Sequence, residues 1–367
     1  MAVKLNYYKR VIFYIFCVQL LLTELTVSYG ALASGVQFII GRKPTNFGPS
    51  QLAVIVNDAD PVSVKVAAYY SYWRHLPKAN VIHVKFTPGQ TTLTRTEFQR
   101  IKATVDAAAP KSIQAYALAW TIPYRVECMS ITTAFAEGFD EAFCSETCGP
   151  TKSSPYFNSG SRRPYDDFGM RPTMMLAGKN FADVKELINR GIASDHTFPR
   201  GVGYLVSTSD KARNVREIFY PDIIQKYMGG PLDLRLVRAD YIENRKNVLF
   251  YFTGIMNVKA LRTVSFVPGA IADHLTSGGG VLVDAGDQMS SLRWLAAGAT
   301  GSYGAVVEPC NFLEKFPNPA IVIDDYVNGE TLIEAYWKSV AWPGQGVFIG
   351  EPLADPFGRR LKTKSAQ

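Results

Sequence analysis

The chain has 367 residues, a length that suits one or two domains. Hydrophobic residues make up 47% and charged residues 19%, which excludes disordered, collagen-like and low-complexity proteins and leaves ample apolar material for a core. The formal net charge is +7. Residues 1–33 carry a net +2 and the residues after Phe357 carry +4, so the remainder carries only +1. No basic face is implied, and the sequence predicts no nucleic-acid partner.

The N-terminus has the pattern of a secretory signal peptide. Basic residues precede an apolar run, 11–22, that would form about 18 Å of helix, too short for a bilayer core of about 30 Å. Small residues at Ala31 and Ala33 then match a cleavage site. We expect residues 1–33 to be removed, leaving a secreted or periplasmic protein with no transmembrane anchor. A retained membrane anchor is the alternative.

Cysteine use fits an oxidising compartment. Of the five cysteines, one lies in the expected signal peptide, and four remain: Cys128, Cys144, Cys148 and Cys310. We predict two disulfides, one between Cys144 and Cys148 and the other between Cys128 and Cys310. The close spacing of Cys144 and Cys148 also suits a metal or redox pair, although no second pair with zinc-like spacing lies nearby.

Apolar runs alternate with helical patterns from residue 51 onward. Strands are expected at 52–56, 81–84 and 115–120, and helices at 62–75 and 96–108. Asp60 and Pro61 have the residue types that begin a helix, which supports the first of these helices.

Residues 121–175 interrupt this alternation. They hold three of the four remaining cysteines and many Gly, Pro and Ser residues, without helical or strand periodicity. A stretch of this length without elements of its own is typical of a functional loop or of an excursion held by disulfides.

The alternation returns near residue 182. Strands are expected at 203–206, 248–252, 280–283, 305–307 and 347–349, and helices at 182–192, 212–228, 269–275, 290–297 and 331–340. This order predicts an α/β fold with a mostly parallel sheet and helices on both faces. We expect a linker over 34–50, one domain over 51–357 that carries the 121–175 excursion, and a basic tail over 358–367.

Ligands of parallel sheets bind beyond the carboxyl ends of the strands. Five charged residues follow expected strands and form the predicted ligand site: Asp58, Asp60, Arg125, Asp284 and Asp287. Their carboxylates could hold Ca²⁺ or Mg²⁺. Helix capping is the alternative role of Asp60. Arg125 could bind an anionic group, or it could form an ion pair with Glu127.

The motifs of the common hydrolases and nucleotide-binding proteins are missing. No Gly-rich phosphate loop joins a strand to a helix, and neither G-x-S-x-G nor H-E-x-x-H occurs. His274 and Cys310 are the one pair that suggests a Cys–His hydrolase. Neither directly follows an expected strand, and structural roles for both are the alternative.

Segments spread over residues 50–357 resemble those of a family of uncharacterised secreted bacterial proteins. They lie at 57–63, 69–81, 123–126, 266–270, 297–302, 307–309 and 350–357. The likeness covers nearly all of the expected mature chain, but that family carries no established activity to transfer.

The ending over 329–335 and 350–352 resembles the last helix and strand of gingipain and caspase-like cysteine peptidases. In that family a catalytic His follows one central strand and a catalytic Cys follows the next. The corresponding positions here are 253–254 and 285–286, which hold neither residue. The resemblance therefore implies a caspase-like scaffold without the peptidase dyad, used by an exported binding or structural protein. The alternative is a hydrolase that uses Asp58, Asp60, Asp284 and Asp287, with or without a divalent cation.

Overall fold

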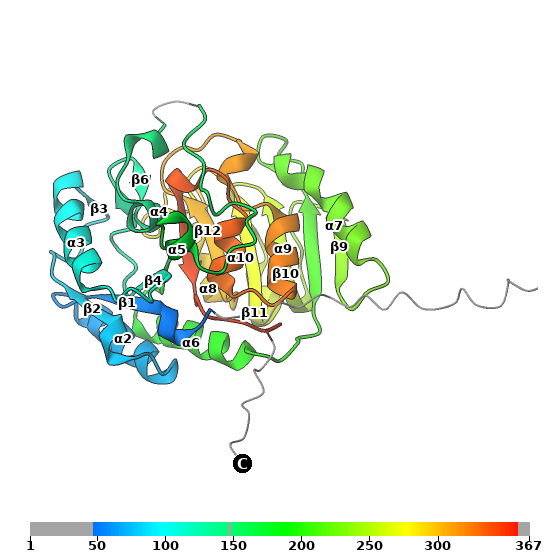
Figure 1. Ribbon diagram of the computed structural model, residues 1–367. Coiled ribbons are helices and arrows are strands. Elements are labelled where there is room, and N and C mark those ends of the chain that lie inside the picture. Colours follow the sequence, from blue (N-terminus) through cyan, green and yellow to red (C-terminus); the bar gives the residue numbers. More distant parts are fainter. Residues whose placement is uncertain (1–46, 146–147, 359–367) are drawn as a thin grey trace, which may run out of the picture. The chain divides into compact units, whose positions relative to one another are not determined.

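A ten-stranded sheet runs through the residues that the computed structural model describes, 47–145 and 148–358, with β2 and β9 at its two ends (Figure 1). It consists of two blocks of five strands. In the order of the sheet, the first block is β2 (Val81–Val84), β1 (Leu52–Asn57), β4 (Ala115–Leu118), β7 (Thr173–Met175) and β13 (Gly346–Gly350). The second block continues with β12 (Gly301–Ala305), β11 (Val264–Leu275), β10 (Arg245–Gly254), β8 (Val202–Ser207) and β9 (Asp233–Arg238).

The two blocks run in opposite directions. Neighbouring strands are parallel within each block, whereas β12 and β13 pair antiparallel, from Gly301 opposite Gly350 to Ala305 opposite Gly346. The carboxyl ends of the first block therefore share an edge with the amino ends of the second. The predicted α/β class with a mostly parallel sheet is confirmed, but its strand ends face two edges rather than one.

Helices cover both faces of the sheet. Alternate residues of β1 enter different cores, with Leu52, Val54 and Val56 in one and Ala53 and Ile55 in the other. The first core also receives α2 (Pro61–Trp73), α7 (Tyr220–Tyr227), α9 (Pro319–Val327) and α10 (Leu332–Lys338). The opposite face is covered by α3 (Arg95–Ala108), α4 (Ile131–Glu137) and α8 (Leu292–Ala297). Helix α6 (Phe181–Ser194) connects the first block to the second along the chain. It contributes side chains to the core on each face of the sheet.

The 121–175 segment contains more regular structure than predicted. It supplies α4, the short helix α5 (Pro164–Phe168) and the central strand β7. Two further strands, β5 (Arg125–Val126) and β6 (Met129–Ser130), form a small separate sheet with β3 (Thr92–Leu93). Elements of two to seven residues are too short to display a period, so the expectation of an irregular excursion was wrong.

Two other expected elements are different in the structure. The predicted helix at 269–275 is the second half of β11, and the predicted strand at 280–283 is irregular chain. Residues 269–275 are buried throughout, the polar Asp273 and His274 included, so the order of polar and apolar residues follows neither the strand nor the helix period. The periodicity of such a run therefore could not distinguish the two.

The structure contains two disulfides, but their pairing differs from the prediction. Cys128 bonds to Cys144, with 5.5 Å between their Cα atoms, and Cys148 bonds to Cys310. The prediction joined Cys144 to Cys148 and Cys128 to Cys310, whereas the segment that contains β6 and α4 brings Cys144 to Cys128. Cysteine spacing alone cannot give connectivity.

The expected signal peptide, most of the linker and the tail from residue 359 lie outside the described residues. Within the described part of the chain, no helix has both the length and the apolar character needed to cross a membrane.

Candidate functional site

The five predicted site residues belong to different parts of the sheet. Asp58 and Asp60 follow β1 in the first block, and Asp60 caps α2 by accepting a hydrogen bond from the Val62 N–H at 2.8 Å. Asp284 and Asp287 are exposed in the chain after β11, which ends at the opposite edge. No hydrogen bond or ion pair joins any two of the five within the described structure. Ligand binding by these residues stays a prediction.

Asp58 and Arg125 have separate local surroundings. Oδ1 of Asp58 lies 2.7 Å from Nδ1 of His83 on β2. Arg125 belongs to the small sheet, and its buried Nε has no hydrogen-bond partner among the described residues. Glu127 accepts from the Arg95 N–H at 2.8 Å. Among residues 47–145 and 148–358, no group of three or more His, Cys, Asp or Glu side chains is arranged to hold a metal ion.

His274 and Cys310 have structural roles. The Trp294 indole N–H donates to Nδ1 of His274 at 2.9 Å, so the ring proton is on Nε2, which lies 2.9 Å from the Met289 carbonyl oxygen. Burial lowers the pKa of His274 to about 3, and the ring is neutral at physiological pH. The Cys310 sulfur is bonded to Cys148. Neither side chain is available for a Cys–His dyad.

Of the two positions expected to correspond to the peptidase dyad, 253–254 and 285–286, only the first lies at the end of a strand. Thr253 and Gly254 do end β10, as expected. The strand beside β10 is β11, which ends at Leu275, so positions 285–286 do not directly follow a strand. The error comes from the predicted strand at 280–283, which is irregular chain.

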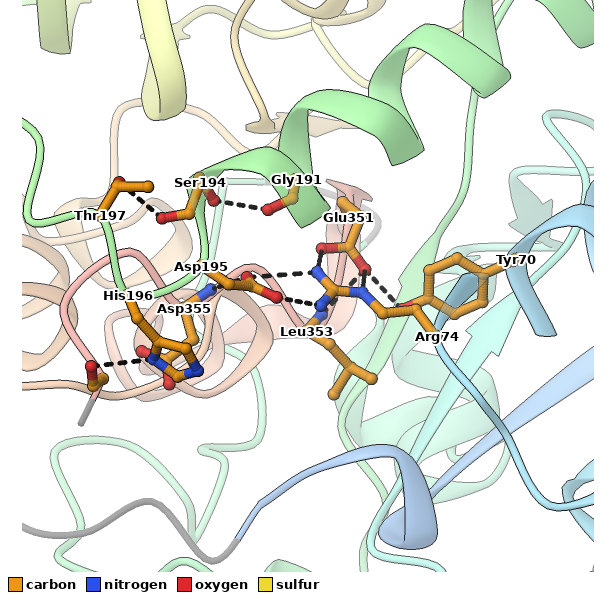
Figure 2. A network of polar contacts seen from close by, with 11 residues as sticks. Tyr70, Arg74, Gly191, Ser194, Asp195, His196, Thr197, Glu351, Leu353 and Asp355 are labelled. Atoms are coloured by element: carbon orange, nitrogen blue, oxygen red, sulfur yellow. Dashed lines mark hydrogen bonds and ion pairs between the residues drawn. The ribbon is translucent and has the colours of Figure 1, made fainter. Parts of the chain in front are cut away.

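A buried polar network joins α2, the end of α6 and the segment after β13 (Figure 2). Arg74 forms ion pairs with both Asp195 and Glu351. Glu351 also accepts from the Tyr70 hydroxyl at 2.6 Å, and Asp195 accepts from the Asp355 N–H at 3.0 Å. Burial raises the pKa of Glu351, and the Arg74 guanidinium opposes this effect. The charged groups largely satisfy one another, which makes this network a structural clamp.

A cavity of about 660 Å³ lies beyond the carboxyl ends of β8 and β9. The three hydroxyl residues that end and follow β8, at 207–209, line one side of it. The last residue of β9, Arg238, and the following Asp240 line another. Lys211 and Glu217 complete its set of charged residues. We refer to this space as the β8–β9 cavity.

The carboxylates of the β8–β9 cavity are held by neighbouring serines. Glu217 accepts a hydrogen bond from the Ser207 hydroxyl, which lowers the pKa of the glutamate. Asp240 accepts from the Ser209 N–H at 2.8 Å, which lowers the pKa of that aspartate. Both carboxylates are therefore ionised at neutral pH.

The cations of the cavity differ from its carboxylates. The side chains of Lys211 and Arg238 form no hydrogen bond and no ion pair with the part of the chain that the structure describes, and both residues are exposed. Both cations are nevertheless close enough to Glu217 to lower the pKa of its carboxyl. The lining thus combines two hydrogen-bonded anions with two cations that make no direct polar contact with the described residues.

The β8–β9 cavity lies next to a reversal of chain order in the second block. Strand β8 has β9 on one side and β10 on the other, so the chain order reverses between β8 and β10. The Thr208 hydroxyl donates to the Gly254 carbonyl at 2.5 Å, which joins the ends of β8 and β10 at that reversal. The open space lies next to the reversal, on the β9 side, where the carboxyl ends of parallel strands can still bind a ligand.

Sequence reasoning missed this site because it missed β9. Strand β9 lies at an edge of the sheet with only Leu234 and Val237 half-buried and its other residues exposed, in a stretch where the sequence predicts no element. The predicted helix at 212–228 is a 3₁₀ helix, η4 (Asn214–Phe219), followed by α7. The available signal was the alternation of Leu234, Leu236 and their charged neighbours, typical of an exposed edge strand.

A second cavity, of about 220 Å³, lies between α6 and α8 beyond the end of β7. Its lining includes Arg190, whose guanidinium donates to the Ala299 carbonyl at 3.0 Å and to the Leu295 carbonyl at 2.7 Å. Because this cation is already engaged, and because the space is smaller, the β8–β9 cavity is the stronger candidate for a ligand site.

Comparison with known proteins adds no family to this geometry. No protein-family model, no curated protein and no solved structure matches the chain. The function must therefore be argued from the site itself.

Proposed function

We propose that this chain is an exported binding protein that holds a small polar molecule in the β8–β9 cavity. The observation that carries the proposal is the position of the cavity, beyond the carboxyl ends of the parallel strands β8 and β9, the edge at which open α/β sheets bind ligands. Its volume of about 660 Å³ falls within the range of about 300–1,000 Å³ that small-molecule sites occupy. A lining of hydroxyl and charged groups suits a polar molecule.

The proposal includes a caspase-like scaffold that is not used for peptide cleavage. It is supported by the resemblance of the chain ending and by the engaged states of His274 and Cys310. Export is supported by the N-terminal sequence and by the two disulfides, which are typical of oxidising compartments.

A thermal-shift screen of the purified full chain tests the binding function. The panel contains neutral sugars, sugar acids, sugar phosphates and amino acids. A ligand that binds only the folded protein raises the melting temperature. Hits are then measured by calorimetry on Ala239→Trp, which adds an indole to the lining of the cavity, and on Ala107→Trp, an equal change on the exposed side of α3. We expect hits that Ala239→Trp abolishes and Ala107→Trp retains. An empty screen, or hits that Ala239→Trp retains, would refute the proposal.

A further inference from the structure

The two cations of the β8–β9 cavity restrict the chemistry of its ligand. Lys211 follows β8 and Arg238 ends β9, so the two charges reach the cavity from different strands. A guanidinium offers a planar fork that matches carboxylate and phosphate groups, and an ammonium adds a flexible point charge. Both cations lower the pKa of Glu217, but neither forms a hydrogen bond or ion pair with the described residues, and an anionic ligand would supply a direct contact.

The carboxylates add a second restriction. Glu217 and Asp240 are ionised, and each is anchored by a serine. An ionised carboxylate has about four acceptor sites, so each retains capacity for hydroxyl groups of a ligand. The same carboxylates repel a bare anion that approaches without hydroxyl groups.

Taken together, the four charged side chains exclude several ligand classes. A neutral sugar would leave both cations without a direct contact to an anion, and a cationic ligand would be repelled by Lys211 and Arg238. We infer that the ligand is a hydroxylated anion, a small molecule that carries a carboxylate or phosphate group beside hydroxyl groups. This inference rests on the proposed binding function and specifies its ligand.

Calorimetric titration of the full chain at pH 7 and low salt tests the class directly. The probes are glucuronate, glucose 6-phosphate, glucose and inorganic phosphate. We expect glucuronate or glucose 6-phosphate to bind at least tenfold more tightly than both glucose and phosphate, and the tighter of the two identifies carboxylate or phosphate as the anion. Glucose or phosphate binding as tightly as both hydroxylated anions would overturn the inference, as would no binding by either hydroxylated anion.

A matched pair of double variants tests the named cations. Lys211→Gln with Arg238→Gln removes two positive charges from the cavity, and Arg245→Gln with Lys246→Gln removes two from exposed positions at the start of β10. A charge-assisted hydrogen bond contributes about tenfold or more to affinity, so we expect the first variant to weaken anion binding by at least 30-fold. The second should stay within about threefold, since screened surface charges act weakly. Equal losses in the two variants would overturn the inference.

The two proposals fail in different ways. If neutral compounds bind, Ala239→Trp abolishes them and the cavity double variant does not, then the binding function stands and the hydroxylated-anion inference is wrong. If no compound of the screen binds, both are wrong. Circular dichroism and thermal unfolding of each variant verify that the fold is retained.

Discussion

Arg74 and Glu351, 277 positions apart, form a buried ion pair in which Nε of Arg74 donates to Oε1 of Glu351 at 3.0 Å (Figure 2). The pair joins the end of α2 to the segment that follows the last strand. Residues 351–358 are all buried although they form no helix or strand. Glu351 also accepts from the Leu353 N–H at 3.3 Å, which satisfies a buried donor of this segment. The irregular segment is therefore held inside the protein by its own carboxylate.

Replacing Arg74 with Met should strongly destabilise the protein. The change leaves Glu351 buried without its cationic partner, and breaking one side of a buried pair lowers the free energy of unfolding by about 3–5 kcal/mol. The control is Arg235→Met, which removes the partner of Asp233 on the exposed face of β9 and should lower it by less than about 1 kcal/mol. Urea denaturation measures both values. Similar losses in the two variants would contradict the clamp.

Stability should fall as the pH rises from about 4 to about 7. Burial raises the pKa of Asp355 from 3.8 to about 7. Between these values the folded state binds a proton that the unfolded state releases, so raising the pH favours unfolding. Each such group contributes a slope of at most about 1.4 kcal/mol per pH unit. Glu330, with a pKa that burial raises to about 7, acts in the same window.

Asp355→Asn isolates one of these groups. The amide cannot titrate, so the variant should lose part of the decline in unfolding free energy between pH 4 and pH 7. Chemical denaturation at several pH values and constant ionic strength gives the slope. An unchanged slope in Asp355→Asn would show that this carboxyl is not responsible.

The two disulfides should differ in their effect on stability. The Cys148–Cys310 bond spans 162 residues and the Cys128–Cys144 bond spans 16. In the chain-entropy model, loops of these lengths correspond to about 5 and about 3 kcal/mol of stabilisation. Denaturation of the two double Cys→Ala variants compares them, and we expect the larger loss for Cys148 with Cys310. Non-reducing peptide mapping should recover these pairs, and a peptide joining Cys144 to Cys148 would contradict the structure.

Gly254→Ala should push the end of β10 away from the segment that follows β8. A Cβ at this position would lie 1.8 Å from the Arg213 carbonyl oxygen, so the backbones must separate. Overpacking of this kind lowers the free energy of unfolding by about 1–3 kcal/mol or more. Gly48→Ala is the control, because its Cβ would meet nothing within 4 Å. Thermal unfolding compares the two variants, and equal stability would contradict the close approach at Gly254.

Local signals in the sequence predicted some elements well and could not predict others. The start of α2 depends on Asp60 and Pro61, which are adjacent residues, and both its helix and the strand before it lie where expected. The antiparallel pairing of β12 with β13 depends on contacts between distant segments, and no local pattern encodes it. Because strand direction was unknown, the rule that ligands bind at carboxyl ends could not separate the two edges. Because β9 was missed, Arg238 and Asp240 were not considered.

Hydrogen–deuterium exchange with and without the tightest-binding probe tests the central claim most directly, since it locates the bound ligand. The account predicts the largest slowing of exchange in peptides that cover 207–211 and 236–240, around the β8–β9 cavity. Peptides covering 57–60 and 177–179, at the carboxyl edge of the first block, should change least. The largest slowing at that first-block edge would contradict the assignment of the ligand site.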